Sequence, residues 1–167
     1  HRIVLTFDEV QAGFGRTGKF WAFEHYGVTP DVICCGKGIS SSLPLSAVIG
    51  REEVMDAYPP GAMTSTHTGN PVCCAAAMAA IRKIVTEKLT ENAAALEKPL
   101  RDGLKKIQAK HPRVIGHVTA AGLVAGMQTV KPGTKEPDHD LAHRIIELCY
   151  QRGLLLFAPV GAWGQTV

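Results

Sequence analysis

The chain has 167 residues, of which 46% are hydrophobic and 20% charged, and its formal net charge is +3. Lysines and arginines are scattered among acidic residues, so no basic stripe indicates a nucleic-acid partner. The apolar runs are too short to span a membrane, and no signal peptide opens the sequence. We therefore expect a globular protein with a cytoplasmic location and without nucleic-acid or membrane partners.

The five cysteines form two adjacent pairs and one single residue. None has the CxxC spacing of a zinc site, and adjacent cysteines rarely bind one metal ion together. We expect reduced, buried thiols and no metal ion. The cysteines are Cys34, Cys35, Cys73, Cys74 and Cys149.

The first 88 residues alternate short apolar runs with turns, which indicates an α/β domain. The expected elements, in chain order, begin with a buried strand at 3–7, a short helix at 20–26 and strands at 32–35 and 45–49. A short helix at 52–57 and a long helix at 72–85 follow. Pro71 suits the first turn of the long helix, where its missing N–H is not needed.

The pattern changes after His111-Pro112, where strands of a second sheet are expected, and the natural domain boundary lies near residues 86–90 or within the long helix that follows. Thr90 is the predicted N-cap of a helix that reaches residue 110, with a kink or break at Pro99. Strands are expected at 114–118 and 122–130. Asp138 or Asp140 then caps a helix that ends at Gly153, and a last strand follows at 154–157.

Two ionisable residues stand where apolar strands end. Asp8 follows the first predicted strand, and Lys37 follows the second within a Gly-Lys-Gly sequence. Open α/β sheets place their chemistry at such strand ends. Taken singly, Asp8 fits a strand-end cap or an ion pair, and Lys37 fits a solvated lysine. Together they indicate a covalently held carbonyl cofactor, with the lysine as Schiff-base nucleophile and the aspartate as partner of a ring nitrogen.

A glycine-rich segment at residues 13–18 matches the pattern G-x-G-x-x-G of dinucleotide-binding proteins. That fingerprint requires a long helix from the third glycine and an acid at the end of the next strand. Here Gly18 is followed by a short aromatic segment, and the next strand ends in two cysteines. A tight structural loop is the favoured interpretation.

Three motifs in fixed order give the chain a family resemblance. They are DEVQAGFGRTG at residues 8–18, GKG at 36–38 with LPLSA at 43–47, and THTGNP at 66–71. With these motifs the chain resembles the class III (ω-amino acid) aminotransferases, which are pyridoxal-phosphate enzymes of fold type I. The resemblance covers essentially the whole chain.

The resemblance implies a role for each of five residues. Lys37 would form the Schiff base with pyridoxal 5′-phosphate, and Asp8 would pair with the pyridinium nitrogen. Val10 would pack on one face of the ring, and Gln11 would lie near the phenolic oxygen. Thr66 would bind the cofactor phosphate of the neighbouring subunit in a homodimer.

The resemblance also implies how the chain is divided and what it does. Residues 1–88 would be the end of the large, mainly parallel-sheet domain, and residues 89–167 a truncated small C-terminal α+β domain. The complete enzyme would move an amino group from an amine or amino acid to an oxo acid in a ping-pong reaction. Because both termini look cut, we expect a fragment that is inactive alone.

Two alternatives to transamination remain open. An aminomutase, epimerase or decarboxylase of the same fold would share Lys37 and Asp8. A catalytically inactive fragment or interaction domain is the alternative from another class.

Overall fold

The computed structural model describes residues 3–167. The chain forms two compact units that divide between Ala95 and Leu96, and each unit is described by itself. Helices and strands are mixed along the chain, which confirms the α/β character predicted from the sequence. None of the helices within residues 3–167 combines the length and the apolar character that a membrane crossing requires.

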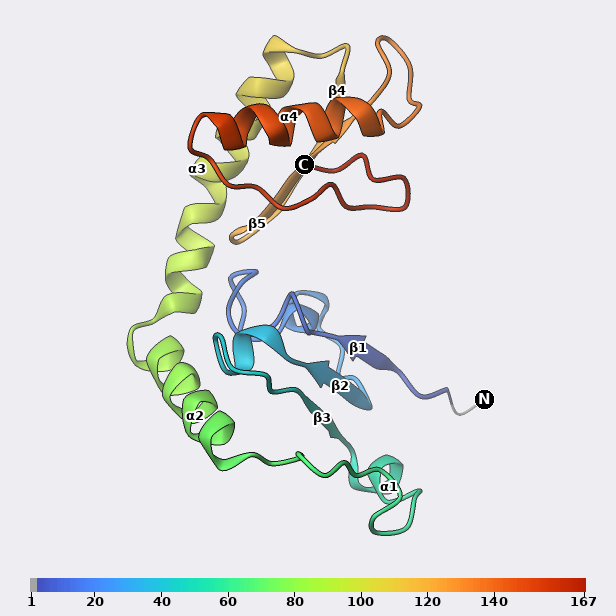
Figure 1. The fold of residues 1–167 in the computed structure, drawn as a ribbon, viewed down its shortest axis with the longest axis vertical. Helices are drawn as coiled ribbons and strands as arrows, with labels where there is room; N and C mark the ends of the chain where they lie inside the picture. Colours follow the sequence, from blue (N-terminus) through green and yellow to red (C-terminus); the bar gives the residue numbers. More distant parts are fainter. Residues whose placement is uncertain (1–2) are drawn as a thin grey trace. The chain divides into compact units, whose positions relative to one another are not determined.

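A three-stranded sheet forms the centre of the first unit (Figure 1). Its strands are β1 (Thr6–Asp8), β2 (Val32–Cys35) and β3 (Ala47–Gly50), in the order β1-β2-β3. β1 and β2 are parallel, whereas β2 and β3 are antiparallel. The three predicted strands are thus present, and the parallel pair brings two carboxyl ends to one edge.

β1 is shorter and more exposed than the buried strand predicted at residues 3–7. Ile3 is 82% exposed, because the ladder with β2 begins only at Thr6. Leu5 is held instead by Asp31, whose carboxylate accepts from the Leu5 N–H at 2.9 Å. The Asp31 N–H donates to the Leu5 carbonyl at 2.8 Å. The prediction of a strand is confirmed at its end, but the prediction that the whole run is buried is wrong.

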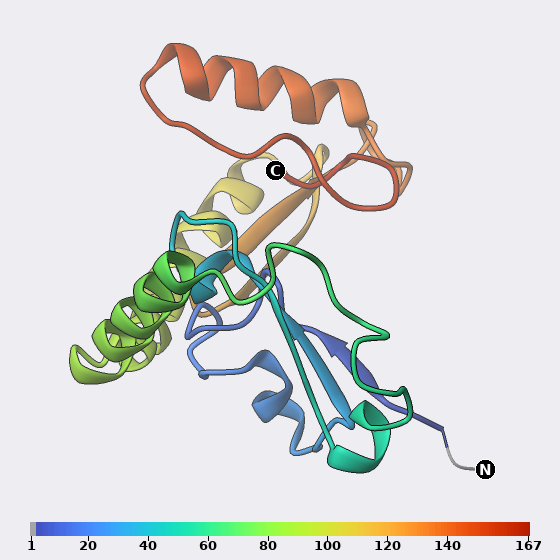
Figure 2. The same cartoon turned by 60° about the horizontal axis from the view of Figure 1, so that its bottom comes forward.

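Five helices follow the strands of the first unit or begin within it. The helices labelled η are short 3₁₀ helices, and the first of them ends at Gly27, which has a left-handed backbone conformation. The short helix α1 lies directly after β3 (Figure 2). The helices are η1 (Ala22–Tyr26), η2 (Lys37–Ile39), α1 (Glu52–Met55), α2 (Pro71–Thr86) and α3 (Leu89–Lys110).

The starts of the two long helices differ in how they are capped. The Asn70 side chain accepts from the N–H groups of Val72 and Cys73 at 3.0 and 3.3 Å, and it therefore caps α2. Thr90 was the predicted cap of α3, but the helix begins before it, so that prediction is wrong. Thr90 instead packs against Gly15, where a Cβ would lie 2.7 Å from the Thr90 hydroxyl oxygen.

α3 continues through Pro99, so the predicted break is wrong. Pro99 cannot donate to the preceding turn, but side chains on either side of it hold the helix in place. Arg101 pairs with Glu97 across the proline. The second carboxylate oxygen of Glu97 accepts from the Gly122 N–H at 2.8 Å. These contacts join the part of α3 around Pro99 to the turn after β4 and stabilise the helix there, so that it continues without a break.

The second unit contains an antiparallel hairpin of β4 (Ile115–Ala121) and β5 (Val124–Thr129). Ile115, Val118 and Met127 form its buried core, with Leu104 of α3 packed against them. Two strands were predicted here and both are present.

Residues 165–167 extend this sheet along β5. The N–H of Met127 donates to the Val167 carbonyl at 2.8 Å, and the Val167 N–H returns a bond of 3.0 Å. The N–H of Thr129 donates to the Gln165 carbonyl at 2.8 Å. The free edge of β5 is therefore occupied by the end of the chain.

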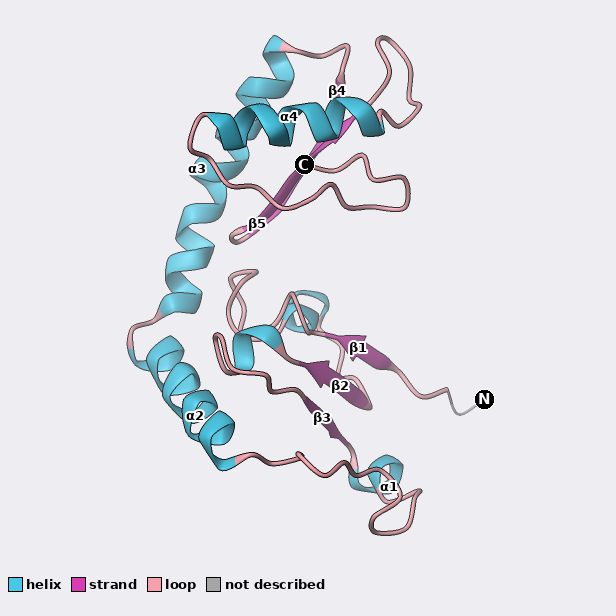
Figure 3. Cartoon of the chain, viewed as in Figure 1, coloured by secondary structure: helices cyan, strands magenta, loops and turns pink. Residues whose placement is uncertain are grey.

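α4 (His139–Gln151) completes the second unit. Asp138 caps it by accepting from the Leu141 N–H at 2.9 Å, and Gly153 follows its end with a φ of 84°, as predicted. The strand predicted at residues 154–157 is wrong: this segment is drawn as loop (Figure 3). Apolar residues form a strand only where a ladder is open to them, and residues 165–167 already occupy the edge of β5.

Candidate active site

Asp8 and Lys37 lie at the same edge of the first unit's sheet. Asp8 is the last residue of β1 and is paired with Cys34 in the ladder. β2 ends at Cys35, and Lys37 begins η2 two residues later. Because β1 and β2 are parallel, the amine and the carboxylate follow the carboxyl ends of neighbouring strands, where α/β sheets place ligands.

Gln11 and Val10 join this pair through direct contacts. The Nζ of Lys37 donates to the Oε1 of Gln11 at 3.2 Å. The Val10 N–H donates to the Oδ1 of Asp8 at 3.0 Å. A Cβ built at Gly36 would lie 3.6 Å from the Cγ1 of Val10, so the valine packs beside the backbone that carries Lys37. Four of the five predicted residues are therefore brought together.

Glu9 anchors the turn on which these residues stand, and the sequence did not reveal it. Its side chain is only 1% exposed. The two carboxylate oxygens accept from the N–H groups of Ala22 and Phe23 at 2.9 and 2.8 Å. Its own N–H donates to the Cys34 carbonyl at 2.8 Å. A buried carboxylate needs such partners, but an acid directly after a strand gives no sign that it is buried.

The backbone of Lys37 is strained. Its φ is +41°, in the left-handed region that costs a residue with a Cβ about 1 kcal/mol or more. The short helix that starts there is fixed by packing, because Ile39 lies in the buried cluster with Ala77 of α2. Strain at a residue over-determined by its surroundings is typical of functional sites.

The glycine-rich segment is a tight loop, as predicted, and not a dinucleotide fingerprint. Residues 10–17 form consecutive turns, and the next helix is the short η1. Gly15 and Gly18 both have a φ of +86°. A Cβ at Gly18 would lie 3.0 Å from the Cβ of Ala94. The glycines therefore serve a close approach between the loop and the start of α3.

Thr66 is not joined to the other four residues by a hydrogen bond. It stands on an exposed turn before α2, where the hydroxyls of Ser65 and Thr68 are 2.8 Å apart. Among the hydrogen bonds of residues 3–167, none joins Thr66 to Asp8, Gln11 or Lys37.

The charges of the cluster are open to a ligand. Asp8 and Lys37 are exposed, and no ion pair in the described part of the chain involves either. At the end of β2, two residues before Lys37, burial raises the pKa of the Cys35 thiol, which donates to the Ala47 carbonyl at 3.4 Å. Cys35 belongs to the buried cluster with Phe14 and Ile39.

The cysteines only partly match the prediction of buried thiols. All five are free, and Cys35 and Cys73 are buried. Cys74 is exposed, so burial was wrongly predicted for it. The reason is its place on the outer side of α2, one residue after Cys73 on a helix whose inner side carries Ala77.

A lysine and an aspartate at one sheet edge are the residue types that a covalently held carbonyl cofactor needs, and comparison with known proteins specifies the class. The family model described as "Aminotransferase class-III" matches residues 1–163. The chain therefore belongs to the class III aminotransferase family, which confirms the resemblance of its motifs.

Three relatives illustrate the range of the family. The chain is 40% identical over 159 residues to the 5-aminovalerate aminotransferase of Pseudomonas aeruginosa, covering 95% of this chain and 37% of that protein. It is 41% identical over 157 residues to the leucine/methionine racemase of Thermococcus litoralis, covering 93% and 35%. The ornithine aminotransferase of Toxoplasma gondii, whose structure has PLP at partial occupancy in its active site, matches with a TM-score of 0.84 and 31% identity, covering 98% and 37%.

The chain matches only part of each of these relatives. It spans 35–37% of the length of these relatives. The family is PLP-dependent, which confirms the predicted cofactor class.

Proposed function

We propose that the protein is a PLP-dependent transaminase that moves an amino group from an ω-amino acid or related amine to an oxo acid. The observation that carries this proposal is the cluster of Lys37, Gln11, Asp8 and Val10 at one sheet edge. The 5-aminovalerate and ornithine aminotransferases among the relatives support a donor with an amine at the end of its chain.

The residues of the cluster have the functional groups that the cofactor needs, and these groups are free to bind it. The Lys37 amine is free to hold an aldehyde carbon covalently. The Asp8 carboxylate, bound only through one oxygen to a backbone N–H, can accept from a protonated ring nitrogen. Once bound, pyridoxal phosphate supplies an electron sink for the substrate carbon next to the amine.

Lys37 would also be the group that moves the proton. As a free amine, the Nζ of Lys37 would accept the proton of the substrate carbon and later return it, which is general acid–base work. The hydrogen bond to Gln11 would hold Nζ in position at the sheet edge.

Thr66 would bind the cofactor phosphate of a neighbouring subunit. Its exposed turn, together with the absence of a hydrogen bond to Lys37 within residues 3–167, supports a role outside its own cluster. The turn leads into α2, whose N–H groups favour a nearby phosphate. We propose a homodimer in which each subunit completes the other's site.

The domain division predicted from the sequence stays a proposal. Residues 1–88 would belong to the large cofactor-binding domain and residues 89–167 to the small C-terminal domain. The sheet with the candidate site in the first unit and the separate hairpin core of the second unit support this division. The predicted cytoplasmic location likewise stays a prediction, which cell fractionation would test.

The need for an acceptor tests the reaction type. With 5-aminovalerate as donor, the complete protein should form product continuously only when an oxo acid such as 2-oxoglutarate is present. The same enzyme mixed with donor alone should release one equivalent of carbonyl product per site and then stop. Continued turnover without an acceptor would contradict the proposal.

Racemisation is the second candidate, because a racemase is among the relatives at 41% identity. A racemase returns the proton to the substrate carbon and needs no oxo acid. Incubation with a single enantiomer of leucine or methionine in deuterated water would separate the two. Racemised, deuterated amino acid without oxo-acid consumption would favour the racemase.

An interaction domain without catalysis is the alternative from another class. It predicts that the purified chain does not become yellow with pyridoxal phosphate and that Lys37→Ala changes nothing. Cofactor absorbance that depends on Lys37 would exclude it.

A further inference from the structure

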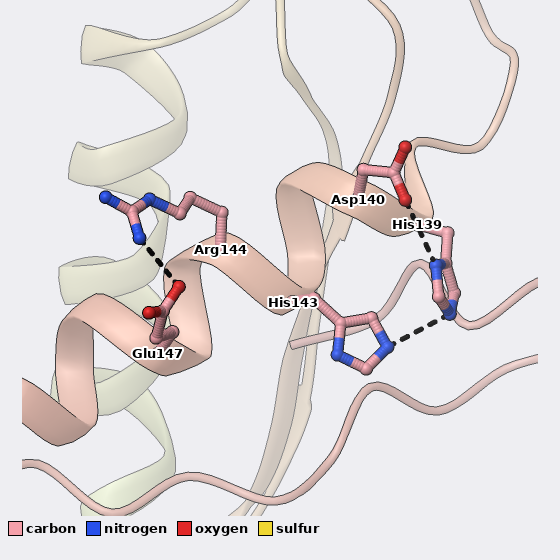
Figure 4. Close-up of a pocket in the computed structure, with 5 residues that line it drawn as sticks. All are labelled: His139, Asp140, His143, Arg144 and Glu147. Atoms are coloured by element: carbon pink, nitrogen blue, oxygen red, sulfur yellow. Dashed lines mark hydrogen bonds and ion pairs between the residues drawn. The ribbon is translucent and has the colours of Figure 1, made fainter.

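The second unit carries a histidine pair that the proposed reaction does not use. His139 and His143 stand four residues apart on α4, so they lie on the same face of the helix. Their ring centroids are 4.3 Å apart, and their Nε2 atoms are 3.0 Å apart (Figure 4). Both side chains are exposed. Two imidazole nitrogens thus lie close together on an exposed face of the helix.

The separation of the two nitrogens fits one kind of metal geometry. With metal–nitrogen bonds of about 2.0–2.1 Å, nitrogens 3.0 Å apart subtend an angle of about 94° at a shared ion. Tetrahedral ligands would need about 3.3 Å. An angle near 90° is that of neighbouring ligands in octahedral or tetragonal coordination, which Ni²⁺ and Cu²⁺ adopt.

Two neighbouring groups favour a tautomer and an orientation of the His139 ring that suit metal binding. The Asp140 carboxylate lies 3.6 Å from the Nδ1 of His139. A negative charge there favours the proton on Nδ1, which leaves the Nε2 lone pair free for a metal ion. A Cβ built at Gly164 would lie 2.5 Å from the Cδ2 of His139, so the ring rests against the backbone there and its orientation is restricted.

We propose that His139 and His143 form a bidentate binding site for a divalent transition-metal ion of the Ni²⁺ or Cu²⁺ type, with water at the other positions. No group of three or more metal-ligating side chains occurs within residues 3–167. The site would therefore bind through two protein ligands and remain open. It lies outside the proposed aminotransferase cluster, and its test is independent of that function.

Without metal the short contact is a hydrogen bond between the rings. One Nε2 must then carry the proton that it donates to the other. Metal binding requires both protons to be on Nδ1 instead. Binding would therefore replace the ring–ring hydrogen bond by two coordinate bonds.

Titration of Ni²⁺ into the complete protein, purified without a histidine tag and kept reduced, tests the proposal. Isothermal calorimetry should show one equivalent per subunit. His143→Ala and His139→Gln should each weaken the binding about tenfold or more, since even the loss of an outer partner has that effect at metal sites. His111→Ala, which removes another exposed histidine of the same unit, should leave the affinity unchanged.

A thermal measurement gives an independent readout. Ni²⁺ should raise the Tm of the wild type and of His111→Ala, because a ligand of the native state stabilises it. It should raise the Tm of His143→Ala less than that of the wild type, and circular dichroism would confirm that this variant is folded. Equal Ni²⁺ affinity in wild type and His143→Ala, absence of binding to the wild type, or loss of binding in His111→Ala would each overturn the proposal.

Discussion

The Nζ of Lys37 donates a hydrogen bond of 3.2 Å to the Oε1 of Gln11, although 26 residues separate them in the sequence. The contact joins the start of η2 to the turn after β1. It places the only amine of the candidate site beside an acceptor that carries no charge. Gln11 therefore orients Lys37 without an ion pair that would compete with a ligand.

The first prediction concerns this hydrogen bond. Gln11→Ala should lower kcat/KM about fivefold, because Lys37 loses the group that holds its amine in place, and one hydrogen bond contributes about 1 kcal/mol. The free energy of unfolding should change little, since the pair is exposed. Steady-state kinetics and urea unfolding measure the two quantities. Gln151→Ala, which removes another exposed glutamine hydrogen bond, is the matched control and should leave kcat/KM unchanged.

The second prediction concerns the buried carboxylate of Glu9. Glu9→Ala should lower the free energy of unfolding by about 2–4 kcal/mol, because the N–H groups of Ala22 and Phe23 lose their acceptors. Glu9→Gln keeps one acceptor and should cost less. Glu24→Ala removes an exposed carboxylate that accepts one backbone bond and should cost about 1 kcal/mol or less. A loss for Glu9→Ala no larger than that for Glu24→Ala in urea unfolding would refute the anchoring role.

Much of the fold follows from local signals in the sequence. Asn70 and Pro71 mark the start of α2, because an amide acceptor and a residue without N–H suit the first turn. Gly27 and Gly153 mark helix ends because their φ values are positive. Asp8 and Lys37 were recognisable as candidate site residues because each follows an apolar run.

The parts that could not be predicted depend on contacts between distant residues. The run at 154–157 has strand composition, but the end of the chain occupies the neighbouring edge of β5. Pro99 predicts a break, yet the bonds of Glu97 to Arg101 and Gly122 hold the helix together. The burial of Glu9 likewise depends on N–H groups 13 and 14 residues away. A local sequence pattern does not indicate which distant residues will be in contact.

The third prediction tests the cap of α2. Asn70→Ala should destabilise the protein by about 1 kcal/mol, because the N–H groups of Val72 and Cys73 lose their acceptor. Asn92→Ala, an exposed position inside α3, should be neutral or slightly stabilising because alanine is the better helix former. Thermal unfolding of the two variants compares them directly, and equal Tm values would contradict the assignment of Asn70 as cap.

The fourth prediction concerns the reactivity of the thiols. Burial raises the pKa of Cys35, so less of its reactive thiolate is present at any pH below that pKa, and access is also limited. Cys74 is exposed and should be the first of these two thiols to react with a disulfide reagent at pH 8. Mass spectrometry after limited labelling locates the modified residue. Earlier labelling of Cys35 than of Cys74 would show that Cys35 is not buried.

The central claim is that Lys37 holds the cofactor and moves the proton. Lys37→Ala and the matched exposed lysine variant Lys19→Ala should be compared in the complete protein for cofactor absorbance and for transamination of 5-aminovalerate. The account predicts that Lys37→Ala loses the absorbance of the covalently held cofactor and at least about 10²–10⁴ in turnover, while Lys19→Ala retains both. Retention of that absorbance and of wild-type turnover in Lys37→Ala would contradict it.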